Sequence, residues 1–189
     1  MAAAGNARGK DAGLHVALLR GVNVGGRRLP MKDLAAMFVA EGCTDVRTYI
    51  QSGNVVFRAR PTLVRRIPSV IGKAIVNRFG FDSPIILRAA ADLRRVATHN
   101  PFLAIGADPT RLHVAFLADV PARSRMAALE PERWHPDEFV VRGGEIYLHY
   151  PRGMGLSKLT NMYFDARLGT VSTVRNWRTV LALLDLTSG

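Results

Sequence analysis

The stretch that most constrains the fold is residues 15–26, HVALLRGVNVGG, which joins an apolar run to a loop containing three glycines. An apolar run of this length, ended by Arg20 and Gly21, is typical of a buried strand. Glycine tolerates positive φ and lets the backbone approach a ligand closely. Pro30 then suits the first position of a helix. The sequence therefore predicts a strand, a glycine-rich loop and a helix in succession.

Two interpretations of this loop follow from its residues. Successive backbone N–H groups in a glycine turn can form a concavity for an anion, and arginine's planar fork suits phosphate. The pattern is neither a dinucleotide fingerprint nor a P-loop. In the alternative interpretation the glycines and the asparagine only turn the chain. The binding interpretation predicts a site containing Arg20, Asn23, Gly25 and Gly26, with Arg27 and Arg28 adding charge.

The net charge of +11 is unevenly distributed along the 189 residues. Residues 1–100 carry 16 Lys and Arg against 6 Asp and Glu, whereas residues 101–189 carry 10 against 9. A half this basic should attract polyanions, of which nucleic acid is the commonest. The alternative is a solvated surface of scattered arginines. A charge imbalance of this kind is informative about association with partners and does not indicate which fold the chain adopts.

Composition also predicts a compartment. Cys43 is the only cysteine, so no internal disulfide can form, and no run of about 18 apolar residues is present to span a membrane. Residues 1–13 lack the apolar block of a signal peptide and read as a disordered tail. We therefore expect a bacterial-type cytoplasmic protein. The five histidines show no metal-ligand spacing, and we expect neither a metal nor another cofactor.

The first half has the element order βαββαβ, which is the ferredoxin-like order. A second helix ends at Phe79 and Gly80. Thr62 is one candidate start for it, but Pro68 would then clash with a helix carbonyl. A start near Ile67 places Pro68 in the first turn and avoids that clash. The predicted strands are 14–20, 46–51, 54–58 and 84–88, and the predicted helices are 30–41 and 67–79.

The second half partly repeats this order, as βαββαα. We predict a helix at 91–99, strands at 112–118, 138–141 and 145–150, and helices at 121–129, 157–168 and 174–186. The whole is an α+β fold with two ferredoxin-like, or α/β-plait, subdomains. The expected organisation is a tail at 1–13, a first subdomain at 14–89, a connector at 90–110 and a second subdomain at 111–189.

Three further polar segments are candidates for the same site. Each also has a purely structural interpretation: a hairpin turn for the first, capping of the predicted 157–168 helix by Ser157 for the second, and a core anchor at Trp177 for the third. In the third segment Arg175 and Arg178 would share one face of the predicted helix. The candidates are Gln51 and Asn54 in the first segment, Ser157, Lys158 and Asn161 in the second, and Arg175 and Asn176 in the third.

Four motifs link the sequence to a family. They are LLRGVNVGG at 18–26, TYIQSGNVVF at 48–57, SKLTN at 157–161 after Tyr150 and Pro151, and TVRNW at 173–177. On these motifs the chain resembles a widespread bacterial family of small cytoplasmic proteins catalogued as a domain of unknown function. The resemblance covers nearly all of residues 14–186. It implies two α/β-plait-like subdomains and no assigned reaction. Pro68 departs from the continuous helix that such proteins more often have.

Three functional hypotheses remain open on the sequence. The first is binding of nucleic acid or a phosphorylated small molecule by the basic loop and helix N-termini. The second is an enzyme acting on a small anionic metabolite, in which His15, Glu145 or Ser157 does proton or acyl chemistry. The third is a non-catalytic homo-oligomer that pairs exposed sheet edges.

Overall fold

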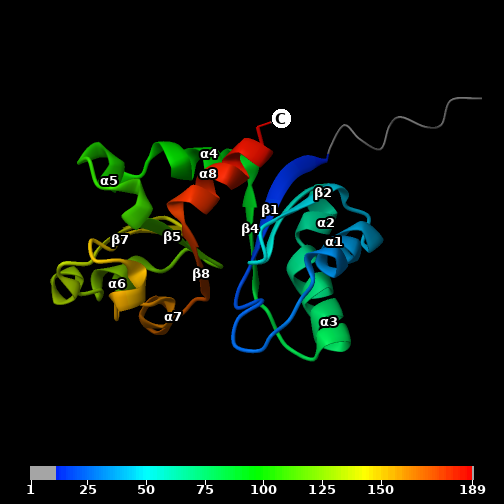
Figure 1. The fold of residues 1–189 in the computed structure, drawn as a ribbon, viewed down its shortest axis with the longest axis horizontal. Helices are drawn as coiled ribbons and strands as arrows, with labels where there is room; N and C mark the ends of the chain where they lie inside the picture. Colours follow the sequence, from blue (N-terminus) through cyan, green and yellow to red (C-terminus); the bar gives the residue numbers. More distant parts are fainter. Residues whose placement is uncertain (1–11, 189) are drawn as a thin grey trace, which may run out of the picture. The chain divides into compact units, whose positions relative to one another are not determined.

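The computed structural model describes residues 12–188, which form two units of similar size. The first extends to Ala90 and also takes in Thr187 and Ser188, and the second comprises Ala91–Leu186. Of the predicted tail, residues 1–11 lie outside the described residues, and β1 already begins at Gly13. Figure 1 shows the order of the elements along the chain.

Each unit contains a four-stranded antiparallel sheet with helices. The elements of the first part of the chain are β1 Gly13–Leu19, α1 Met31–Ala40, β2 Thr44–Tyr49, β3 Asn54–Ala59, α2 Pro61–Val64, α3 Ile67–Phe79 and β4 Ile85–Ala89. Those of the remainder are α4 Ala90–Thr98, α5 Pro101–Ala104, η1 Pro109–Arg111, β5 Leu112–Leu117, α6 Arg123–Ala127, η2 Pro131–Trp134, β6 Glu138–Arg142, β7 Glu145–His149, η3 Met154–Leu156, α7 Asn161–Leu168, β8 Ser172–Asn176 and α8 Trp177–Leu186.

The first sheet has the strand order β2-β3-β1-β4, and α1 and α3 lie on the same side of it (Figure 1). Alternation along β1 directs Ala17 and Leu19 toward these helices, where they join a core with Phe57. Val16 and Leu18 point to the opposite face and are also fully buried.

The predicted helix starts and stops in this unit largely agree with the structure. α3 begins at Ile67 with Pro68 in its first turn, and Gly80 ends it in the left-handed conformation at φ 75°. Ile67, Ile71 and Ile75 recur every four residues and are fully buried. Helix α1 begins at Met31, one residue later than predicted, so Pro30 is its N-cap residue and not its first helical residue. The short α2 precedes α3 as a separate element.

The second sheet repeats the arrangement with the order β6-β7-β5-β8. Ala115 and Ile146 point to one face and pack in a core with Phe164 of α7. On the other face the Tyr147 hydroxyl donates to the Val96 carbonyl of α4 at 3.4 Å. Figure 1 shows α4 and α8 on one side of the second sheet and α6 and α7 on the other. Helices therefore cover both faces.

The predicted element order of the second half is wrong at its end. Residues 172–176 form β8, which pairs antiparallel with β5, and α8 begins only at Trp177. The order is therefore βαββαβα, and the second half completes the ferredoxin-like sheet that the prediction βαββαα left one strand short. Arg175 lies in the strand and Arg178 in the helix, so they do not share a helix face. The α+β class with two ferredoxin-like subdomains is confirmed.

The two sheets also match in backbone detail. The Leu19 amide donates to the Gly53 carbonyl at 2.8 Å, and the Leu117 amide donates to the Gly144 carbonyl at the same distance. In both sheets this bond fastens the end of the first strand to the hairpin beside it. Within residues 12–188, no helix is both long enough and apolar enough to cross a membrane.

Candidate functional site

The glycine-rich loop forms a tight turn at its tip. The Arg27 amide donates to the Val24 carbonyl at 3.1 Å, and the residues between them, Gly25 and Gly26, have φ angles of 57° and 83°. A two-residue turn with positive φ at both central positions is of type I′, which favours glycine at both. The turn interpretation therefore accounts for this pair of glycines without a ligand.

Asn23 holds the loop in place through its side-chain amide. Its Nδ2 donates to the Leu29 carbonyl at 3.1 Å and to the Gln51 carbonyl at 2.7 Å, and its Oδ1 accepts from the Leu29 amide at 2.9 Å. The Asn23 backbone adopts φ 56°, which asparagine tolerates better than most residues. Asn23 is thus a positioning residue that fastens the loop to the β2–β3 hairpin.

The hairpin tip is equally well fixed. Asn54 is fully buried, and its Nδ2 donates to the Tyr49 carbonyl at 3.1 Å and to Ser52 Oγ at 3.0 Å. These bonds stabilise the turn, so the structure gives Asn54 a structural role. The Gln51 side chain is exposed, while its carbonyl accepts from Asn23.

The tip of the loop carries backbone amides and two arginine side chains. Among residues 12–188, nothing accepts a hydrogen bond from the amides of Gly25, Gly26 or Arg28. The Arg27 guanidinium lies 5.9 Å from the centre of the Phe81 ring, which orients it. Arg28 is exposed beside it. The arrangement is chemically suited to an anion because it combines amide donors with the positive charges of two arginines.

Arg20 contributes to this region through its backbone. Its carbonyl accepts from the Ser83 hydroxyl at 2.9 Å, and its amide donates to the Pro84 carbonyl at 2.9 Å. Ser83 is buried, and nothing in its local sequence indicated this bond. The loop is therefore anchored on one side by the hairpin and on the other by the chain entering β4.

In the second unit the SKLTN segment does not begin a helix as predicted. Ser157 Oγ donates to Asp137 Oδ2 at 2.6 Å and accepts from the Leu159 amide at 2.9 Å. These bonds hold residues 157–159 as a turn, and α7 starts at Asn161. Ser157 therefore does not cap the helix, whereas Lys158 remains exposed beside it.

The side chains of the TVRNW segment have structural roles in the second unit. The Arg175 side chain is buried, and its Nη1 donates to Thr173 Oγ1 at 2.8 Å and to the Val174 carbonyl at 2.9 Å. Burial lowers the pKa of Arg175 to about 10, so the side chain stays charged at neutral pH. Asn176 Oδ1 accepts from the Thr179 amide at 2.8 Å and caps α8. Trp177 is a core anchor in α8.

The structure thus gathers Arg20, Asn23, Gly25, Gly26, Gln51 and Asn54 at one end of the first sheet. Ser157, Lys158, Asn161, Arg175 and Asn176 belong to the second unit. A single site built from both groups stays a prediction of the sequence. In the two groups, the side chains of Asn23, Asn54, Ser157 and Asn176 bond to the protein and fix a turn or a helix end.

The candidates for acid–base chemistry have structural partners as well. His15 Nδ1 lies 2.9 Å from the Gly13 carbonyl, and its ring stacks on Phe57 at 5.8 Å between centroids. Glu145 is buried at the start of β7. In the part of the chain that the structure describes, no group of three or more His, Cys, Asp and Glu side chains is placed to hold a metal ion.

Two antiparallel sheets of matching strand order, each with its own helices, define a protein with two ferredoxin-like halves. Within this class the chain belongs to the family described as "Protein of unknown function (DUF1697)", whose model matches residues 14–147. The family resemblance inferred from the motifs is confirmed.

A solved structure of similar fold is that of conserved bacterial protein SP0830 from Streptococcus pneumoniae. The two share 16% sequence identity with a TM-score of 0.68, over 94% of this chain and 99% of the other. At this identity the likeness concerns the fold alone. No curated protein matches the sequence.

Proposed function

We propose that the protein binds the phosphate backbone of nucleic acid through the tip of the loop at residues 20–29. The observation that carries the proposal is an exposed turn in which the amides of Gly25, Gly26 and Arg28 have no partner among the described residues. Arg27 and Arg28, both exposed, follow these glycines in the chain. Backbone amides and arginine are the groups that proteins commonly direct at phosphate oxygens.

The rigidity of the loop supports the proposal. The three hydrogen bonds of the Asn23 side chain and the contact of Arg27 with Phe81 fix the turn before any ligand arrives. A preorganised site loses less conformational entropy on binding than a mobile one. The glycines then serve both the turn geometry and the approach of a phosphate group, because they add no side chain at the tip.

A polymer backbone suits this site better than a small metabolite. Metabolite sites usually enclose most of the ligand, whereas residues 23–28 are exposed around the whole turn. Plait folds that read RNA stack bases on an open sheet face. Here that mode is unfavourable because the central strands present the aliphatic residues Val16, Leu18 and Val56 on the face away from α1 and α3. We therefore propose contact with phosphates and no reading of base sequence.

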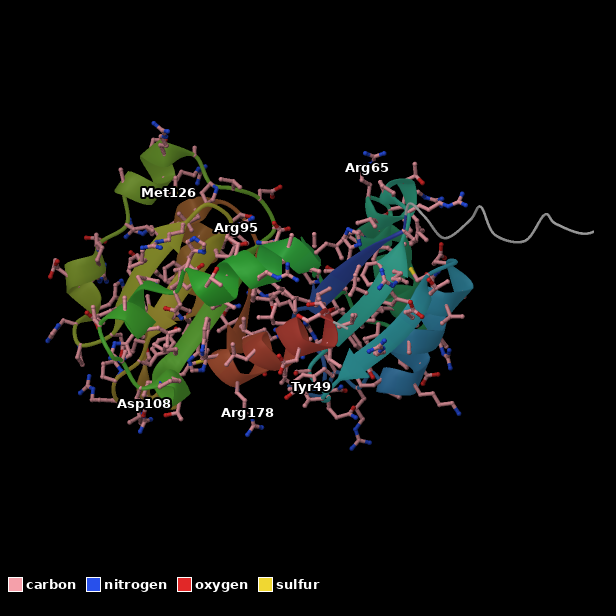
Figure 2. All side chains as sticks on the ribbon, turned by 90° about the horizontal axis from the view of Figure 1, so that it is seen from above. Tyr49, Arg65, Arg95, Asp108, Met126 and Arg178 are labelled. Atoms are coloured by element: carbon pink, nitrogen blue, oxygen red, sulfur yellow. The ribbon has the colours of Figure 1, made fainter. Side chains whose placement is uncertain are left out.

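The test measures binding to labelled single-stranded and double-stranded oligonucleotides across a range of salt concentrations. Arg27→Glu/Arg28→Glu should weaken binding by about tenfold or more and reduce the salt slope by roughly one to two. The matched control is Arg65→Glu/Arg66→Glu, which makes the same change of charge elsewhere in the first unit. Arg65 and Arg66 are both exposed, and the Arg65 side chain extends away from the fold (Figure 2).

The control should bind nearly as well as the parent protein. An equal loss in both double variants would reduce the effect to net charge and reject the loop as the site. Absence of measurable binding by the parent at low salt would reject the proposed function itself.

A further inference from the structure

We propose a second site, in the second unit, that takes a small organic phosphomonoester. Its location is an open depression of about 460 Å³ between η2 and the segment that joins β7 to α7. Arg133, Trp134 and His135 line one side, and Arg152, Leu156 and Lys158 line the other. The volume lies in the range of small-ligand sites. Its evidence is independent of the nucleic-acid proposal, which concerns the first unit.

The charge around the depression favours an anion. Arg152 and Lys158 are exposed and have no acidic partner in residues 12–188. Arg133 lies 3.5 Å from Glu130, which also pairs with Arg167 at 3.3 Å, so one carboxylate is shared between two arginines. The acidic residue in the lining, Asp137, is mostly buried.

One hydrogen bond and one aromatic contact hold η2 and the residues after it against the β7–α7 segment and α7. The Asp137 carboxylate accepts from the Ser157 hydroxyl at 2.6 Å and so links the residues after η2 to the β7–α7 segment. Within the β7–α7 segment, the hydroxyl of the fully buried Tyr150 donates to the Leu159 carbonyl at 3.0 Å and stabilises that side. Trp134 packs edge-on against Tyr163 of α7, with 4.6 Å between ring centroids. These contacts stabilise the backbone that carries Arg133, Arg152 and Lys158.

An apolar surface adjoins these cations, which is why we propose an organic ester rather than a free inorganic ion. Leu156 is 79% exposed although it lines the depression, and the Trp134 ring lies in the opposite wall. An exposed leucine gains free energy when an apolar group covers it. The Arg133 guanidinium lies 5.6 Å from the Trp134 ring centre, so one part of that ring is already occupied by a cation. A ligand with an anionic head at Arg152 and Lys158 and an apolar body at Leu156 matches the lining.

Calorimetry with phenyl phosphate, inorganic phosphate and phenol tests the proposal directly. Phenyl phosphate should bind at least about tenfold more tightly than inorganic phosphate, and phenol should not bind detectably. Arg152→Ala/Lys158→Ala should weaken phenyl phosphate binding by about tenfold or more. The matched control, Arg123→Ala/Arg178→Ala, removes two exposed charges from the same unit and should leave binding within about twofold. The Arg178 side chain extends outward from α8 (Figure 2).

A third variant, Leu156→Ser, separates the two parts of the ligand. It should weaken phenyl phosphate binding and leave inorganic phosphate binding unchanged. A lipid source for the phosphomonoester is tested with vesicles that contain phosphatidic acid. Binding to vesicles without binding to phenyl phosphate would overturn the small-molecule assignment. Equal losses in the two double variants, or equal affinity for phenol and phenyl phosphate, would overturn the site.

Discussion

Arg88 and Arg175 occupy the same position in the two sheets. Arg88 pairs with Val16 of β1 in the register of the first sheet, and Arg175 pairs with Val114 of β5 in the second. Each guanidinium donates from Nη1 to the carbonyl of the preceding residue, at 2.8 Å for Arg88 and 2.9 Å for Arg175. In both cases a helix follows directly, α4 after β4 and α8 after β8. The two sheets thus match at this arginine position as well as in strand order.

Gly53 should be among the least replaceable residues of the first unit. A Cβ at Gly53 would lie 2.6 Å from Val22 Cγ2 and 2.7 Å from Leu19 Cβ, and its φ is 68°. Gly53→Ala should therefore cost about 3 kcal/mol or more in the free energy of unfolding. Gly25→Ala is the control, because φ is also positive there but the space is open, and should cost about 1–2 kcal/mol. Urea denaturation measures both, and equal costs would contradict the clash.

Asn176 should stabilise α8 as its N-cap. Asn176→Ala removes the acceptor for the Thr179 amide and should lower the free energy of unfolding by about 1 kcal/mol. Thr160 holds the equivalent position before α7 but makes no side-chain capping bond. Thr160→Ala should therefore leave stability nearly unchanged. Thermal or urea denaturation of the two variants compares them, and a larger loss in Thr160→Ala would refute this account.

His113 should make the protein less stable in mild acid. Burial lowers the pKa of His113, which lies edge-on to Tyr150 at 5.3 Å, so the folded protein resists protonating this ring. The unfolded chain takes up the proton near the ordinary histidine pKa of about 6.5. The unfolded state therefore binds more protons as the pH falls, and stability decreases below that pH.

Urea denaturation at about pH 7 and about pH 5 measures this loss. His113→Gln removes the titrating group, so the decrease in the free energy of unfolding between the two pH values should be smaller than in the parent. A variant with an undiminished decrease would show that other groups cause the pH dependence.

Cys43 should be unreactive in the folded protein. It is buried, and burial, assisted by the charge of Glu41, raises its pKa to about 11. The thiolate is the reactive form, so alkylation by iodoacetamide at about pH 8 should be very slow until the chain unfolds. The same reaction in denaturant supplies the control rate. Rapid alkylation under native conditions would mean that the first unit opens readily around α1.

Much of the fold could be predicted because several element ends carry strong local signals. Pro68 and Gly80 bracket α3, and Gly42 follows the end of α1 with φ 95°. The predicted helix began at Val174 and so included part of β8. Val174 lies three residues before Trp177, which is the spacing of apolar residues on one helix face, so it looks like the first turn of the helix that follows. Thr173 and Val174 are β-branched and Asn176 is a preferred N-cap, so signals for a strand followed by a helix were present.

The candidate sites were harder to predict, for a different reason. Asn23 reaches Gln51 across 28 positions, and Ser157 reaches Asp137 across 20. Bonds of this range depend on how the elements pack, and local composition does not encode them. From the sequence alone, a polar residue in a turn is equally consistent with ligand binding and with a bond to a distant part of the chain. In the structure, Asn23 and Ser157 make bonds of the second kind. Trp134 and Arg152 could not be predicted as lining residues, because neither belongs to a sequence motif.

Helix α4 bears on how the C-terminal half could be produced alone. Leu93 and Val96 are fully buried, and the Val96 carbonyl accepts from Tyr147 of the second sheet. A fragment cut at the start of β5 would lose this cover and leave an apolar sheet face prone to aggregation. A viable boundary for recombinant expression of that half therefore lies upstream of α4.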